Sequence, residues 1–373
     1  MNVIVQRGLM ALLGALLFVV LSPLIALFAP LPLQRHVYHE MAFQLIANRE
    51  LGHSHAPEEI VNAAVDSSRR RLWLVDNVAP YPGKPFDYLV EGVGWCDYTA
   101  KVFCKLLAAK GIHARYVFLR DGRGRSPHTV AEVYLHGQWR VVDPFFSVVY
   151  PIGNGWARLE DITPAMVEAL PEIALLKQTK SGFPGTVVSV GKRTFPLPEP
   201  PTRSDDFMAD KHIFDWVADA YVNVFGSRVA DWYQDLFLQR RLAGIPDPVD
   251  RLWVQARHYH LFGRLSLAEP CYRRLLALNP SRYHERTTLF LARMLIWGHH
   301  YREARDVLNT YLGTAPDTPW AHFQIALCDD ALHDQPETIR HLYRYLELGG
   351  WKYAVQAMAR IAQLEGVRRH STL

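Results

Sequence analysis

The sequence predicts an α+β protein, in which a core of helix and antiparallel sheet is preceded by one transmembrane helix and followed by an all-α repeat region. Three observations predict this organisation. One helix-like run and three strand-like runs fill residues 92–143, the last third of the chain repeats at about 35 residues, and residues 8–33 carry no charge. The 373 residues, 49% apolar and 21% charged, suffice for two or three globular domains.

The uncharged run lies between Arg7 and Arg35. About 20 apolar residues span a bilayer, so we expect residues 1–34 to form an uncleaved, tilted membrane anchor. A cleaved secretory signal is the alternative, but its apolar region is usually only about 7 to 15 residues. The flanking arginines do not fix the orientation. Because the preceding tail is short, we expect a single-pass protein whose large domain is extracytoplasmic, in the periplasm if the cell is Gram-negative.

Cys96 is predicted to begin a helix. It follows the glycines at positions 92 and 94, and apolar residues from Cys96 to Leu107 recur at spacings of four, three and four, which is one face of a helix. The helix should end near Gly111. Unpaired backbone N–H groups and the positive end of the helix dipole favour a thiolate in the first turn, and the thiolate is the nucleophilic form of cysteine.

A hairpin is predicted to bring a histidine and an aspartate together. Residues 114–119 are a predicted strand, and residues 129–135 and 138–143 are two more, joined by a two-residue turn at 136–137. In that register Val130 faces Asp143, and His128 shares the face of Val130. Diagonal neighbours lie about 7 to 8 Å apart at Cα, so His128 and Asp143 can pair. A slip of one residue would separate them.

Cys96, His128 and Asp143 are the side-chain types of a nucleophilic cysteine site. The cysteine attacks a carbonyl, the histidine takes and returns a proton, and the aspartate orients the imidazole and stabilises its charge. The backbone N–H of Cys96 would donate one hydrogen bond to an oxyanion, and the sequence identifies no second donor. The alternative is structural: Cys96 could be a small buried residue, as we expect for Cys104, and the other two a structural pair.

Three further residues, Gly94, Trp95 and Tyr81, are candidates for the substrate cleft, although packing explains a loop aromatic equally well. Cys96 and Cys104 are eight residues apart, and no close Cys/His pair with ligand spacing accompanies them. We therefore expect neither a metal nor a cofactor.

Four motifs in this order resemble the transglutaminase-like core of the papain-like cysteine enzymes. They are Gly94-Trp95-Cys96, residues 110–115, His128 at the start of a strand, and residues 137–144. The resemblance covers roughly residues 60–150 and implies that Cys96, His128 and Asp143 are a catalytic triad. It also implies acyl transfer through a thioester, for which a peptidase or amidase acting on a peptide or protein is favoured. Alternatives are a crosslinking transglutaminase, an arylamine acetyltransferase-like enzyme, and a non-catalytic assembly protein of an envelope or polysaccharide pathway.

The rest of the chain divides by composition. We expect a catalytic domain at 37–195, a Pro-rich linker at 196–210 and an aromatic-rich helical segment at 211–245. In residues 246–366, helix-like runs end at Gly263, Gly298 and His333, an interval of 35 residues. This period with a helix-turn-helix unit resembles the tetratricopeptide repeat. Such arrays bind peptides or proteins on a concave face, and the alternative is that this one only scaffolds or dimerises the enzyme.

The charge distribution argues against nucleic acid as a partner. The formal net charge is +4 over the whole chain, and arginines form no run longer than residues 69–71. The four cysteines do not decide the redox compartment. The expected partners are therefore a peptide or protein substrate, a protein bound by the repeats, and the membrane.

Overall fold

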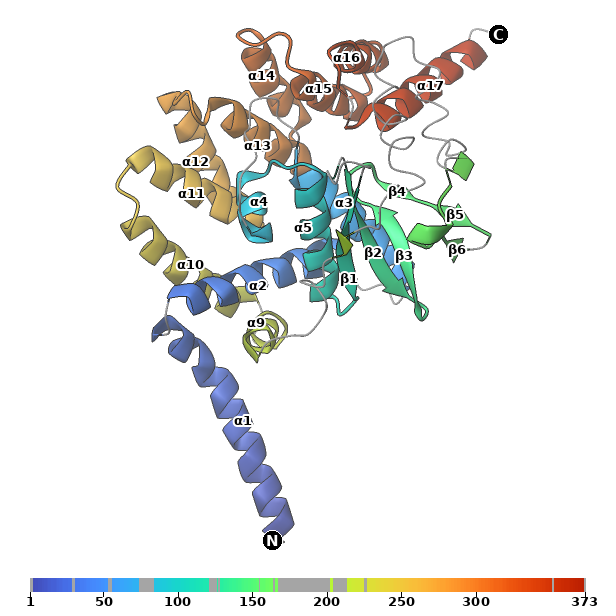
Figure 1. The fold of residues 1–373 in the computed structure, drawn as a ribbon. Helices are drawn as coiled ribbons and strands as arrows, with labels where there is room; N and C mark the ends of the chain where they lie inside the picture. Colours follow the sequence, from blue (N-terminus) through green and yellow to red (C-terminus); the bar gives the residue numbers. More distant parts are fainter. Residues whose placement is uncertain are drawn as a thin grey trace.

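Figure 1 shows the computed structural model, in which a sheet lies among helices that cover most of the chain. The structure describes residues 3–28, 31–52, 56–73, 84–120, 126, 128–153, 155–163, 165–166, 202–203, 213–224, 227–350 and 352–371.

The N-terminal half combines helices with an antiparallel sheet. Its helices are α1 (Val3–Phe28), α2 (Leu31–Glu50), α3 (Pro57–Arg71), α4 (Pro85–Glu91) and α5 (Cys96–Ala109). The sheet has the order β4-β3-β2-β1-β7, with β1 (Ala114–Leu119), β2 (His128–Leu135), β3 (Gln138–Asp143), β4 (Val148–Val149) and β7 (Thr202–Arg203). A small pair, β5 (Pro151–Ile152) and β6 (Gly155–Trp156), precedes the 3-10 helix η1 (Leu159–Asp161). The predicted mixture of helix and antiparallel sheet is confirmed.

Helix α5 lies between the sheet and the preceding helices. It contacts β1 and β2 on one side and α2, α3 and α4 on others (Figure 1). Its apolar residues, including Phe103 and Leu107, are fully buried in one cluster with residues of α2 and α3. The helix ends as predicted, because Gly111 adopts φ +73°, a conformation that favours glycine.

The predicted hairpin and its register are confirmed. Leu135 pairs with Gln138, and Glu132 pairs with Val141. The turn residues His136 and Gly137 have φ of +49° and +79°, the signs that a two-residue turn of type I′ requires. The twist of a type I′ turn matches the twist of the two strands. The turn therefore sets the register, and the register determines which side chains share a face.

The predicted linker contains part of the sheet. Thr202 and Arg203 form β7 and pair with β1 as an edge strand, and Arg203 Nε lies 2.9 Å from Glu132 Oε2. Most of the linker and a second hairpin that the sequence suggests at residues 186–197 lie outside the described residues.

The aromatic-rich helical segment predicted at 211–245 contains two helices, α9 (Ile213–Asn223) and α10 (Ser227–Ala243). Helix α9 ends at Asn223, a poor helix former. Helix α9 packs against α2, and Tyr221 and Tyr233 are buried with Met41 in one cluster.

The C-terminal third consists of consecutive helix pairs. They are α11 (Pro248–Leu261) with α12 (Leu265–Leu278), α13 (His284–Trp297) with α14 (Tyr301–Leu312), and α15 (Pro319–Ala331) with α16 (Gln335–Glu347), followed by α17 (Ala354–Ser371). Residues of positive φ, Gly263, His299 and His333, fall in the turns within the pairs. The helical prediction is confirmed, whereas the tetratricopeptide identity stays a prediction.

The N-terminal run of uncharged residues is divided between two helices. Helix α1 ends at Phe28 and α2 begins at Leu31, so the described residues of this run belong to two helices. In the part of the chain that the structure describes, no helix is both long enough and apolar enough to cross a bilayer, and the predicted transmembrane helix is therefore unsupported. Figure 1 shows α1 pointing away from the body.

The repeat helices share hydrophobic cores with the N-terminal half. Trp73 and Val93 are buried in the cluster formed by α11 to α16, while Leu261 and Phe262 are buried in the cluster of α2 to α5. The two halves of the chain are thus packed into one another rather than joined only by a linker.

Candidate active site

Cys96 is the first residue of α5 and is half-buried. Trp95 precedes it as the N-cap in an extended conformation and is 43% exposed. The Thr99 backbone N–H and hydroxyl both donate to the Trp95 carbonyl oxygen, each at 3.0 Å. These bonds fix the first turn, whose leading N–H groups have no acceptor within the helix. The position predicted for Cys96 at a helix N-terminus is confirmed.

The loop before Cys96 is held by an isolated parallel bridge between Trp73 and Val93. The Trp73 N–H donates to the Gly92 carbonyl oxygen at 2.8 Å, and the Gly94 N–H donates to the Trp73 carbonyl oxygen at 2.9 Å. A Cβ at Gly94 would lie 2.9 Å from Cβ of Tyr98. Gly94, predicted as a cleft residue, therefore allows close approach between this loop and α5.

His128 and Asp143 form a buried pair at the ends of β2 and β3. Nε2 of His128 lies 2.6 Å from Oδ2 of Asp143, and the two residues are 5% and 2% exposed. The pairing predicted from the hairpin register is confirmed. It leaves Nδ1 as the ring nitrogen available to another partner.

The second carboxylate oxygen of Asp143 is also occupied. Oδ1 accepts hydrogen bonds from the backbone N–H groups of Phe145 at 3.0 Å and Phe146 at 3.1 Å. The signal for this arrangement is present in the sequence, because an aspartate followed by Pro144 is typical of a turn in which the side chain bonds backbone two and three residues on. Sequence reasoning missed these contacts.

Two aromatic rings from that turn lie beside the imidazole. The centroid of the Phe146 ring is 5.2 Å from that of His128, and the centroid of the Phe145 ring is 6.2 Å away. No motif in the sequence indicates that these residues belong to the site.

The electrostatic environment of His128 favours its protonated form. Burial lowers the pKa of His128, but the charge and hydrogen bond of Asp143, together with a side-chain hydrogen bond and the charge of Cys96, outweigh it and raise the pKa to about 10. His128 is thus hydrogen-bonded to Asp143 and also interacts electrostatically with Cys96. An imidazolium beside a cysteine sulfur stabilises the thiolate, and the arrangement can perform nucleophilic attack with proton transfer.

The structure thus brings Cys96, His128 and Asp143 together from α5, β2 and β3. Trp95 and Gly94 adjoin Cys96, whereas Tyr81 lies outside the described residues. Cys104 is fully buried, as expected for a structural cysteine. The catalytic roles of these residues stay a prediction.

The repeat helices reach the loops that carry the site. Arg257 of α11 donates from Nε to the Val90 carbonyl oxygen at 2.7 Å and from Nη2 to the Leu89 carbonyl oxygen at 2.8 Å. Lys352, which follows α16, donates to the Leu72 carbonyl oxygen, and its Nζ lies 5.4 Å from the centroid of the Phe145 ring. The residues contacted precede Cys96 or follow Asp143 in the chain. No sequence motif predicts these contacts.

One family model matches the chain. It is described as the transglutaminase-like superfamily and covers residues 46–144, from α2 through the residue after Asp143. Members of this superfamily usually use a cysteine in catalysis. The match contains the three site residues and does not extend to the repeat helices. No curated protein and no solved structure matches the chain. The matched segment is thus transglutaminase-like.

Proposed function

We propose that the protein is a cysteine enzyme that transfers acyl groups through a thioester on Cys96, and that it acts as a peptidase or amidase. The observation that carries this proposal is the position of His128, whose Nε2 lies 2.6 Å from Oδ2 of Asp143 and whose ring also interacts with the Cys96 side chain. The match of residues 46–144 to the transglutaminase-like superfamily supports the same chemistry.

In the proposed reaction the Cys96 thiolate attacks the carbonyl carbon of an amide. The bond from carbon to nitrogen breaks as His128 gives its proton to the leaving amine, and a thioester remains. His128 then takes a proton from water, the hydroxide forms a bond to the acyl carbon, and the released thiolate is again paired with the imidazolium. Asp143 holds the ring throughout, because its other oxygen is fixed by the backbone of the turn.

Hydrolysis and crosslinking share the first step and differ in the acyl acceptor. Water is always present, and hydrolysis is therefore favoured. Transfer to an amine, as in a crosslinking transglutaminase, is the second candidate, and a non-catalytic assembly role is the third.

We also propose roles for the N-terminal helix and for the repeat helices. We propose that α1, which exposes Leu9, Leu13 and Leu16, associates the enzyme with a membrane from the extracytoplasmic side. A peptide or protein bound by the repeat helices would be held near the site. Both roles can be tested apart from the chemistry.

The deciding experiment measures thiol reactivity in the full-length protein. Brief iodoacetamide exposure at about pH 6.5, followed by mass spectrometry, should label Cys96 before Cys271, since a thiolate reacts and a thiol does not. The His128→Ala variant should lose this preference. His136→Ala is the matched control, because His136 is an exposed histidine on the same hairpin. Equal labelling of Cys96 in all three proteins would contradict the proposal.

Turnover is then tested with a library of peptide amides. Release of amine that requires Cys96 indicates hydrolysis, whereas incorporation of a fluorescent primary amine into protein indicates crosslinking. A reactive Cys96 with neither product would favour the assembly role.

A further inference from the structure

A cavity of about 380 Å³ is lined by residues of α2, by the start of α4 and by Lys105 of α5. Its lining includes the basic side chains Arg35, His36, Lys84 and Lys105 among apolar residues. Glu40 is the acidic residue among the described residues that line it.

A second cavity of about 270 Å³ adjoins the first, because Arg35 and His39 line both. It adds Arg240 and Arg241 from the end of α10, with Asp87 as the acidic residue among its described lining residues. Helices far apart in the chain therefore direct cationic side chains to one region.

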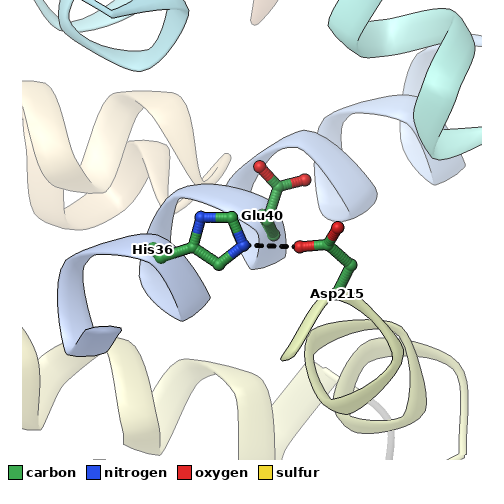
Figure 2. Close-up of side chains that lie close together, drawn as sticks. All are labelled: His36, Glu40 and Asp215. Atoms are coloured by element: carbon green, nitrogen blue, oxygen red, sulfur yellow. Dashed lines mark hydrogen bonds and ion pairs between the residues drawn. The ribbon is translucent and has the colours of Figure 1, made fainter. Parts of the chain in front are cut away.

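Some of these cations are already neutralised. Lys105 Nζ lies 2.6 Å from Glu40 Oε1, and Figure 2 shows His36 of α2 directed at Asp215 of α9, 2.6 Å from Nε2 to Oδ1. By contrast, Arg35, Lys84 and Arg241 make no ion pair with any residue that the structure describes. Three uncompensated charges thus remain around the two cavities.

The pKa of the buried His39 imidazole is affected by the charges around the two cavities. Burial lowers the pKa of His39, and the nearby charges of Arg241, Arg35 and Lys84 lower it further, to about 3. The ring is stacked on Phe86 with centroids 4.1 Å apart, which places it in the wall between the cavities. The three cations therefore act on His39 in the same direction from both cavities.

The same region contains three side chains with the composition of a metal site. One ligand atom from each of His36, Glu40 and Asp215 lies within 4.8 Å of the others (Figure 2). A metal cation is nevertheless disfavoured. The hydrogen bond to Asp215 raises the pKa of His36, so its ring tends to hold the proton that metal binding would have to remove, and Lys105 already occupies Glu40. The unpaired cations would repel a further positive charge.

We propose that this paired cavity binds a phosphate group, with Arg35, Lys84 and Arg241 as its ligands. Guanidinium and ammonium groups are the usual partners of phosphate, since a phosphate offers several acceptor oxygens and a negative charge to match the donors. The site lies on α2, α4 and α10 and uses none of the three residues proposed for acyl transfer, so the two proposals stand or fall separately.

The phosphate can come from an anionic lipid headgroup or from a soluble phosphate ester. Helix α1 leads directly to Arg35 and exposes Leu13, Leu16 and Leu17, which fits a site held at a bilayer surface. The chemistry of recognition is the same for both sources.

The test uses full-length protein in a neutral detergent at about 0.15 M ionic strength, where weak surface attraction is screened. One arm measures the shift in Tm with inorganic phosphate against sodium chloride at equal ionic strength. The other measures flotation with vesicles of phosphatidylcholine alone or mixed with phosphatidylglycerol. Wild type is compared with the Arg35→Gln/Lys84→Gln/Arg241→Gln variant.

The matched control removes three exposed arginines of the repeat helices, as Arg251→Gln/Arg274→Gln/Arg302→Gln, and so changes net charge equally. We expect the cavity variant to bind on the order of 100-fold more weakly, at about fivefold per cation, and the control to bind like wild type. A Tm shift with inorganic phosphate identifies a soluble ester, and flotation that requires phosphatidylglycerol identifies a lipid. Equal binding by wild type and the cavity variant, or no response of wild type to either probe, would overturn the proposal.

Discussion

Nε of Arg257 lies 2.7 Å from the carbonyl oxygen of Val90, although the two residues are 167 positions apart in the chain. Val90 is in the last turn of α4, where carbonyl groups lack partners within the helix. Arg257 is 2% exposed, and its guanidinium lies 3.6 Å over the ring of Phe290. The repeat helices therefore cap the helix that leads to Gly92 and then to Cys96.

Removing this cap should loosen the loop before the nucleophile. We expect Arg257→Ala to lower the free energy of unfolding by about 2 to 4 kcal/mol, since two carbonyl groups lose a charged donor. Alkylation of Cys96 should also slow at temperatures where the variant is fully folded, because the loop positions the first turn of α5. Chemical denaturation and timed iodoacetamide labelling measure the two effects.

Arg251→Ala is the control for Arg257→Ala, because Arg251 is an exposed residue of the same helix. It should change neither stability nor labelling by more than about 0.5 kcal/mol or its equivalent in rate. If Arg257→Ala is destabilised but labels Cys96 at the wild-type rate, the repeats support the fold without positioning the site.

Gly92 lies in that loop beside Phe290 of α13. It has φ +67°, and a Cβ there would lie 1.9 Å from Cζ of Phe290. We expect Gly92→Ala to cost about 2 to 5 kcal/mol of stability, from left-handed strain and overpacking together. Gly111→Ala isolates the strain, since Gly111 has φ +73° with nothing within 4 Å of the added Cβ, and should cost only about 1 to 2 kcal/mol.

A double variant separates the two causes at Gly92. Phe290→Ala removes the ring that the new methyl group would strike, so Gly92→Ala should cost about 1 to 3 kcal/mol less in that background than in wild type. Denaturant unfolding of the four proteins gives this coupling. Additive costs would mean that the ring moves aside freely.

Local patterns in the sequence were sufficient to predict α5, the hairpin and the His128–Asp143 pair. The spacing of apolar residues predicts which face of α5 is buried. The two-residue turn sets the register of the hairpin, and the period of two along each strand then puts His128 and Asp143 on the same face of the sheet. These features depend on residues close in the chain, and the family match of residues 46–144 falls on the same segment.

The contacts between distant segments could not be predicted in this way. Arg257 and Phe290 look like ordinary residues of a helical repeat, and only the folded chain shows that they meet Val90 and Gly92. A charged side chain in a helix gives no sign of which distant carbonyl it will cap. The composition of the predicted linker likewise gave no sign that Thr202, within it, pairs with β1.

The raised pKa of His128 makes a contribution to stability that depends on pH. The folded pKa of about 10 lies above the ordinary value of 6.5, so the folded protein holds the proton more tightly than the unfolded chain. The contribution is fully present below about pH 6.5 and is lost as pH rises through about 10. We expect the stability difference between wild type and His128→Gln to shrink from pH 6 to pH 10. A difference that is constant or grows would contradict the direction of the shift.

The measurement is guanidinium unfolding of both proteins across that range. His136→Gln is the control, because His136 is exposed on the same hairpin, paired with Glu58 at the surface. Any change of the unfolding free energy with pH that His136→Gln shares with wild type is subtracted. The remaining change is the contribution of the His128–Asp143 pair.

Asp143 has two functions that two substitutions can separate. Asp143→Asn keeps an oxygen that can accept from the N–H groups of Phe145 and Phe146, but it presents an amide N–H to Nε2 of His128. That nitrogen must then be an acceptor, which places the proton of a neutral ring on Nδ1 and leaves Nδ1 unable to accept the proton of Cys96. We expect alkylation of Cys96 to slow by about 10²- to 10⁴-fold with little loss of stability. Asp143→Ala removes the turn bonds as well, and unfolding should become easier by a further 1 to 3 kcal/mol or so. Labelling rates and denaturant unfolding, measured on both variants, test whether these two functions of Asp143 are separate. Equal stability of the two variants would mean that the turn does not depend on the carboxylate.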